Sequence, residues 1–89
     1  MVHKNIVIRG WVQGVGFRYA ARKMALHWGI TGFVRNLPDG SVYMEAEGHE
    51  ATMDEFIAWC HTGPSRAQIS SVSIEDGPMH DFMDFDIAF

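Results

Sequence analysis

The chain has 89 residues, which is enough for one modest core and too few for two, so we expect a single domain over residues 1–89. The formal net charge is −4 and no lysine- or arginine-rich stretch is present, which argues against a nucleic-acid partner. No apolar run is long enough to cross a membrane, no secretory signal opens the chain, and the lone cysteine, Cys60, excludes an internal disulfide. These features predict a soluble, cytoplasmic protein with no membrane association.

The first elements are a strand, a glycine loop and a helix. Residues 5–11 alternate between two faces with a period of two, which is typical of a strand. From Phe17 the apolar positions take the spacing of an amphipathic helix, and Gly29 is placed to end it. The stripe expected to face the core consists of Phe17, Ala20, Ala21, Met24, Ala25 and Trp28.

The middle of the chain predicts a β-hairpin. Residues 30–37 and 41–47 have the composition of strands, and Pro38-Asp39-Gly40 supplies the turn, because proline presets φ and glycine accepts a positive φ. In the second of these strands we expect Val42, Met44 and Ala46 to point inward, and Tyr43, Glu45 and Glu47 to point outward.

The last third of the chain predicts a second helix and a fourth strand. The helix covers residues 50–61 and ends at Gly63-Pro64, although capping-box spacing also allows a start at Thr52. The strand covers residues 69–74, and a change of phase near Ser70-Ser71 indicates a bulge.

A short closing strand over residues 85–89 completes the order β-α-β-β-α-β plus a terminal strand. This order is typical of an α+β, ferredoxin-like sandwich, in which two helices cover one face of an antiparallel sheet. In that topology the first two strands run parallel with the third between them. Their carboxyl ends therefore lie at the same edge of the sheet, beside the start of the first helix.

The loop between the first strand and the first helix is a candidate anion site. Gly14 and Gly16 allow backbone N–H groups to converge, the helix start adds unpaired donors, and Arg18 adds a planar, permanent charge. From the spacing alone, an ordinary turn with a solvated arginine is equally open. The loop is not a nucleotide-binding fingerprint, because Tyr19 replaces the third glycine of GxGxxG and no Lys-Ser/Thr pair follows.

The topology also makes Asn36 a candidate residue. It lies at the end of the second strand, and the loop with Arg18 follows the first. Strands two places apart in a sheet are about 10 Å from each other, so both side chains can reach into the gap between them.

Two segments of the chain resemble the signatures of the acylphosphatase family, GWVQGVGFR at residues 10–18 and GFVRNLPDGSV at residues 32–42. The resemblance continues through residues 46–48, 63–64 and 85–87 and so covers nearly the whole chain. It implies a hydrolase that needs no metal or cofactor and cleaves the carboxyl–phosphate anhydride of small-molecule acyl phosphates, acting as a monomer. Trp11 and Tyr43 depart from the residues that are frequent in the family at these positions.

The resemblance also implies roles for individual residues. The phosphate is held by the loop and the arginine, and the asparagine matching Asn36 orients the attacking water. Gln13 and Val15 are expected to contribute only their backbone. The phosphate-binding residues are then Gln13, Gly14, Val15, Gly16, Phe17 and Arg18, and the catalytic residues are Arg18 and Asn36.

Two other functions are open. The same cradle could bind phosphate or an acyl phosphate without turnover, or the domain could bind a regulatory effector and oligomerise through its sheet edges. No metal site is expected, because Met53 replaces the second histidine of HExxH after His49-Glu50 and the remaining histidines are scattered along the sequence. The latter are His3, His27, His61 and His80.

Overall fold

A computed structural model describes all 89 residues, and its elements follow the predicted order. The first strand begins earlier than predicted, at Val2, and the last ends earlier, at Ile87. The elements are β1 (Val2–Trp11), α1 (Phe17–His27), β2 (Thr31–Asn36), β3 (Val42–Gly48), α2 (Glu50–Cys60), β4 (Gln68–Asp76) and β5 (Phe85–Ile87).

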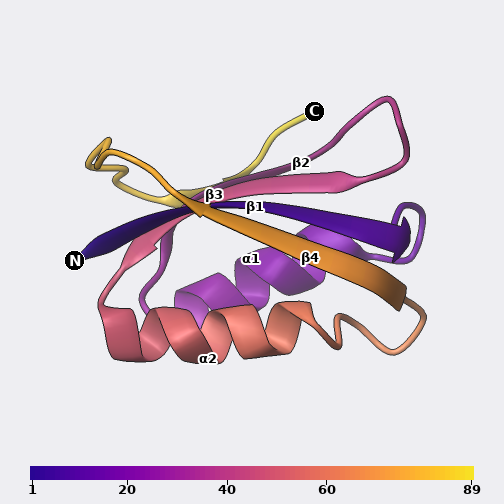
Figure 1. Ribbon diagram of the computed structural model, residues 1–89, viewed down its shortest axis with the longest axis horizontal. Helices are drawn as coiled ribbons and strands as arrows, with labels where there is room; N and C mark the ends of the chain where they lie inside the picture. Colours follow the sequence, from indigo (N-terminus) through magenta and orange to yellow (C-terminus); the bar gives the residue numbers. More distant parts are fainter.

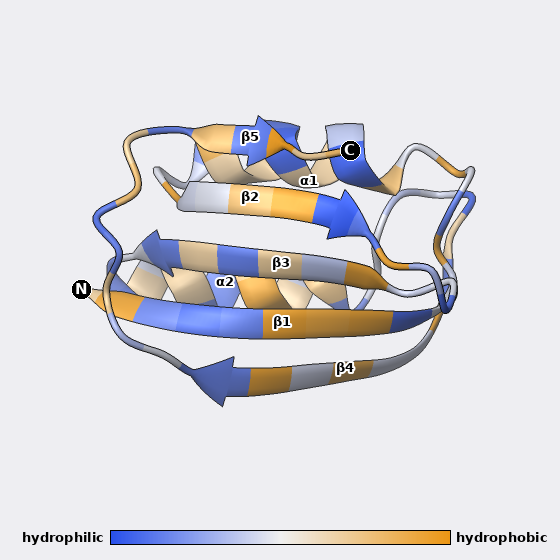
Figure 2. Cartoon of the chain, turned by 90° about the horizontal axis from the view of Figure 1, so that it is seen from above, coloured by the Kyte–Doolittle hydropathy of each residue, from blue (hydrophilic) through white to orange (hydrophobic).

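The five strands form one sheet in the order β4-β1-β3-β2-β5 (Figure 2). β3 pairs antiparallel with both β1 and β2, so β1 and β2 run parallel on either side of it, as predicted. Both helices lie on the same face of the sheet (Figure 1). The ferredoxin-like α+β prediction is confirmed, and β5 adds a short strand parallel to β2 at one edge.

The predicted bulge lies in the pairing of β1 with β4. Arg9 is opposite Ser71 but Gly10 is opposite Ile69, so Ser70 is an extra residue on β4. Gly10 has φ 134°, and a Cβ there would lie 2.1 Å from the backbone oxygen of Gln68. Only glycine fits where the two strands come this close.

The core lies between the helices and the sheet. The predicted inward face of β3 is confirmed, because Val42, Met44 and Ala46 are fully buried. The predicted stripe of α1 is buried at its centre and half-buried along its margins. The fully covered helix residues are Phe17, Ala21 and Ala25 from α1 and Met53, Phe56 and Cys60 from α2.

The thiol of Cys60 should be unreactive in the folded chain. Burial raises its pKa to about 12, and the thiolate is the form that reacts with alkylating reagents. We expect iodoacetamide at pH 8 to leave Cys60 unmodified in buffer and to label it rapidly in denaturing urea, as measured by mass spectrometry. Equal labelling rates in the two solutions would show that the Cys60 thiol is accessible in the folded chain.

The outer face of the sheet is not fully open to solvent. Residues 77–84, which connect β4 to β5, pass over it at the end near the N-terminus (Figure 1). The backbone N–H groups of His80 and Phe82 donate to the Glu47 carboxylate at 2.6 and 3.1 Å. The predicted outward direction of Glu47 is confirmed, but its side chain is only 1% exposed, because the returning chain covers it.

Glu47 also bonds to His3, whose Nδ1 lies 2.7 Å from the carboxylate. Burial alone would raise the pKa of Glu47, but the two backbone donors and His3 hold it below the usual value. Burial alone would lower the pKa of His3, but its bonds to Glu47 and Asn5 raise it. The buried polar groups of His3 and Glu47 thus have the hydrogen-bond partners that offset the cost of removing them from water.

Candidate active site

The loop between β1 and α1 takes its shape from two glycines. Gly14 has φ 74° and Gly16 has φ 78°, both in the left-handed region. A Cβ at either position would meet no atom within 4 Å, so the backbone conformation, and not lack of space, requires glycine there. Gly16 is the N-cap of α1 and no side chain caps the helix, which leaves first-turn N–H groups available to an external anion.

This loop and the end of β2 enclose one cavity of about 220 Å³. Arg18 and Asn36 both line it, so the structure brings the two predicted catalytic side chains to one site. Gly14, Gly16 and Phe17 of the predicted phosphate loop line it as well. The remaining lining residues are Val12 and Tyr19.

Two predicted loop residues do not line the cavity. Val15 is 7% exposed and belongs to the hydrophobic core. The side chain of Gln13 turns to the β2–β3 hairpin, where Nε2 donates to the carbonyl oxygens of Leu37 and Ser41 at 2.8 and 2.9 Å. The Gln13 amide therefore joins the β1–α1 loop to the hairpin that carries Asn36, a structural role that the sequence pattern did not predict.

The hairpin turn has bonds of its own. Asp39 accepts from the backbone N–H and from the hydroxyl of Ser41, at 2.9 and 2.5 Å. These two bonds lower the pKa of the exposed Asp39 carboxyl below its usual value. The Asp39–Ser41 bonds therefore fix the conformation of the turn whose carbonyl oxygens accept the Gln13 hydrogen bonds.

Replacing Gln13 with alanine should loosen the cavity. Two hydrogen bonds are lost, each contributing about 0.5–1.5 kcal/mol to stability, and the loop and hairpin become free to separate. We expect a lower melting temperature together with a lower kcat/KM, in thermal unfolding and steady-state assays. Gln68→Ala, at an exposed site on β4, is the matched control, and equal behaviour of the two variants would contradict this role.

The charge of Arg18 is not neutralised by any carboxylate, since the ion pairs of the molecule involve only His3, Lys4 and His80 as cations. Its guanidinium carbon instead lies 4.8 Å from the centre of the Phe89 ring, within the range of a cation–π contact. The ring restrains the side chain without competing for its N–H donors. An anion in the cavity would therefore meet an unpaired, positioned charge.

A family model described as acylphosphatase matches residues 4–87, nearly the whole chain. The chain belongs to the acylphosphatase family. Among curated relatives, the acylphosphatase of Archaeoglobus fulgidus is 40% identical over 89 residues, covering 100% of both chains. That of Anaeromyxobacter dehalogenans is 43% identical, over 99% of this chain and 96% of the relative.

Solved acylphosphatase structures have the same fold. The crystal structure of acylphosphatase from Bacillus subtilis superposes with a TM-score of 0.97 at 30% identity, covering 100% of both chains. An acylphosphatase from Coxiella burnetii gives a TM-score of 0.95 at 33% identity, over 98% of this chain and 92% of that one.

Membership of this family also identifies the reaction. The chain is a hydrolase of acid anhydrides, which cleaves the carboxyl–phosphate anhydride of acyl phosphates to a carboxylate and inorganic phosphate. The resemblance found in the two signature segments is thus confirmed for family, fold and activity. Neither helix has the length and apolar character needed to span a bilayer.

Proposed function

We propose that the phosphoryl group of the substrate binds in the cavity between the β1–α1 loop and the end of β2, with Arg18 and Asn36 as the catalytic residues. One observation carries this proposal: the two side chains come from separate segments and line the same cavity as Gly14 and Gly16.

The loop and Arg18 hold the phosphoryl oxygens. Backbone N–H groups of the loop at Gly14, Gly16 and Phe17 and the positive end of the α1 dipole face the anion, and the guanidinium donates to two oxygens at once. The chain as a whole is acidic, so this local concentration of donors is what draws an anion to the cavity. Because the donors are fixed before the substrate arrives, they stabilise the charge that builds on the phosphoryl oxygens during transfer.

Asn36 positions the water. Its amide oxygen accepts a hydrogen bond from the water while its NH₂ group donates elsewhere, and its neutrality avoids the repulsion that a carboxylate would have for the phosphate. The water oxygen attacks phosphorus, the bond from phosphorus to the acyl oxygen breaks, and the carboxylate leaves with its electron pair. The water proton passes to a phosphate oxygen. A carboxylate is a good leaving group, so positioning supplies most of the catalysis.

Hydrolysis of benzoyl phosphate by the purified chain, followed by loss of its ultraviolet absorbance, tests the proposal directly. Turnover that is competitively inhibited by inorganic phosphate supports it. Phosphate binding without turnover would instead favour a non-catalytic phosphate-binding module.

We also propose that the chain works as a single-domain, cytoplasmic monomer on small-molecule acyl phosphates. The full-length match to the Archaeoglobus fulgidus relative supports one domain, and a free, buried cysteine suits a reducing compartment. Size-exclusion chromatography with light scattering should give a mass near 10.0 kDa, and a multiple of that mass would overturn the monomer.

Chelation should leave the activity unchanged. The positive charge at the cavity comes from Arg18 and backbone N–H groups, so no step of the proposed reaction uses a metal ion. We expect the same kcat and KM for benzoyl phosphate before and after EDTA treatment, at a temperature where the chain is fully folded. Loss of activity that a divalent cation restores would contradict this mechanism.

A further inference from the structure

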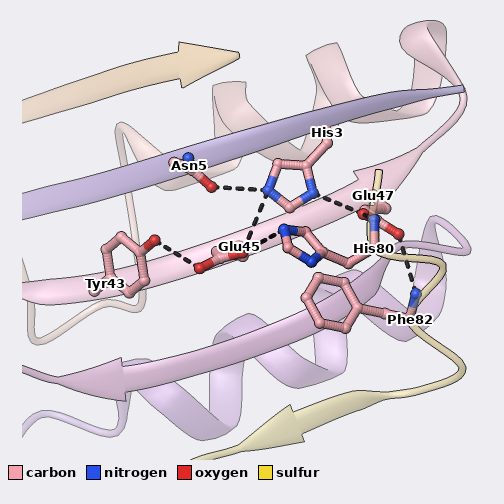
Figure 3. A network of polar contacts seen from close by, with 7 residues as sticks. All are labelled: His3, Asn5, Tyr43, Glu45, Glu47, His80 and Phe82. Atoms are coloured by element: carbon pink, nitrogen blue, oxygen red, sulfur yellow. Dashed lines mark hydrogen bonds and ion pairs between the residues drawn. The ribbon is translucent and has the colours of Figure 1, made fainter. Parts of the chain in front are cut away.

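Two histidines and a glutamate meet on the outer face of the sheet, away from the cavity (Figure 3). His3 lies on β1, Glu45 on β3 and His80 in the segment that returns over the sheet. One ligand atom from each lies within 4.8 Å of the other two. His3 and His80 are far apart in the sequence, which is why no metal site is expected there, but the return of residues 77–84 brings His80 back to β1.

The separations suit a small metal ion. His3 Nε2 lies 3.4 Å and His80 Nε2 lies 3.9 Å from the same oxygen of Glu45, Oε1. With metal–ligand bonds of about 2.0–2.1 Å, neighbouring ligands of a tetrahedral zinc ion are roughly 3.3–3.4 Å apart. The first pair already has this spacing. The His80 side chain is 51% exposed and lies outside any helix or strand, so a small inward shift is easy.

Hydrogen bonds from behind His3 and Glu45 orient these two side chains toward a common point (Figure 3). His3 Nδ1 donates to Glu47 at 2.7 Å, which directs Nε2 toward Glu45. The Tyr43 hydroxyl donates to Oε2 of Glu45, also at 2.7 Å, which leaves Oε1 for the imidazoles. A carboxylate behind a histidine ligand and a donor behind a carboxylate ligand are the arrangement that orients metal ligands in proteins.

We propose that His3, Glu45 and His80 bind a divalent transition-metal ion, with Zn²⁺ as the best match. Two imidazole nitrogens and one carboxylate oxygen form a donor set that zinc favours and that magnesium and calcium do not. On binding, the metal replaces the proton of His3 Nε2 and the hydrogen bond from that nitrogen to Asn5 Oδ1. Water completes the coordination on the exposed side.

The ion would act on stability and not on catalysis. Trp11 lies eight residues after His3 along β1, roughly 26 Å away at about 3.3 Å per residue, and the catalytic cavity lies beyond that far end. The ligands come from β1, β3 and the returning segment, so the ion joins three parts of the chain that are distant in sequence. A ligand that binds only the folded state raises its stability.

Calorimetric titration of the untagged chain with Zn²⁺, followed by thermal unfolding, tests the site. We expect saturable binding with a stoichiometry of one and a higher melting temperature with zinc. Co²⁺ should give the intense visible absorption bands of tetrahedral coordination, which zinc should then abolish. Absence of saturable binding, or weak octahedral cobalt bands, would overturn the proposal.

Two variants and a control localise the ion. His80→Ala and Glu45→Gln should weaken zinc binding by more than the roughly 10–100-fold that loss of an orienting partner causes, and should remove the thermal shift. His61→Ala, an exposed histidine after α2, should bind zinc as the parent chain does. Unchanged affinity in both cluster variants, or loss of binding in His61→Ala, would refute the site. Activity toward benzoyl phosphate is assayed separately, and its failure would bear only on the catalytic proposal.

Discussion

Replacing Arg18 with alanine should lower kcat/KM for benzoyl phosphate by at least about 100- to 1,000-fold. Loss of one preorganised donor to a transition-state oxyanion costs about 2.7–4 kcal/mol, and Arg18 supplies two donors and a full charge. The guanidinium contacts the phosphoryl group before and during reaction in our proposal, so inhibition by inorganic phosphate should weaken as well. Steady-state kinetics and thermal unfolding separate this loss from misfolding.

Arg18→Lys and Arg66→Ala provide the controls. Lysine keeps the charge but not the planar fork, so it should restore little of the activity. Arg66 is exposed in the connection between α2 and β4, and its removal should leave the kinetics unchanged. A lysine variant with near-parental kcat/KM would refute two-point recognition of the phosphoryl group.

Replacing Asn36 with alanine should lower kcat by roughly 100-fold or more while leaving phosphate inhibition nearly intact. In our proposal the amide positions water and does not hold the anion, so the effect is confined to the reacting geometry. The inhibition constant of phosphate against benzoyl phosphate is the deciding measurement. If phosphate no longer competes in this variant, Asn36 belongs to anion binding instead.

Asn36→Asp sharpens the test, because the two side chains have nearly the same shape. The carboxylate adds a negative charge inside the cavity, so this variant should lose phosphate affinity as well as kcat. Equal inhibition constants in the alanine and aspartate variants would place the side chain away from the bound anion. The two Asn36 variants thus report on position and charge separately.

The fold could be predicted because its signals are local. Short windows of sequence show the period-two strands, the core-facing stripe of α1 and the bulge near Ser70. The structure contains each of them. The convergence of Arg18 with Asn36 followed from strand order alone. It needed no knowledge of side-chain conformation, only that β1 and β2 run parallel with one strand between them.

The sequence did not reveal the contacts made by segments without periodicity. Gln13 bonds to two carbonyl oxygens of the hairpin, and a glutamine in a glycine loop carries no signal of such a partner. Residues 77–84 form no helix or strand, so their path over Glu47 could not be foreseen. The meeting of His3, Glu45 and His80 depends on that path, and the roles of the cavity residues stay predictions until the variants are measured.

The bulge at Ser70 lowers the tendency of the chain to aggregate through the edge of its sheet. β4 forms one edge of the sheet, pairs only with β1, and so presents an unpaired row of backbone donors and acceptors to solvent. A long, flat edge of this kind recruits strands from neighbouring molecules and promotes aggregation. The extra residue twists the strand and interrupts its ladder, and Glu75 and Asp76 add like charges near its end. These features favour a chain that stays dispersed at high concentration.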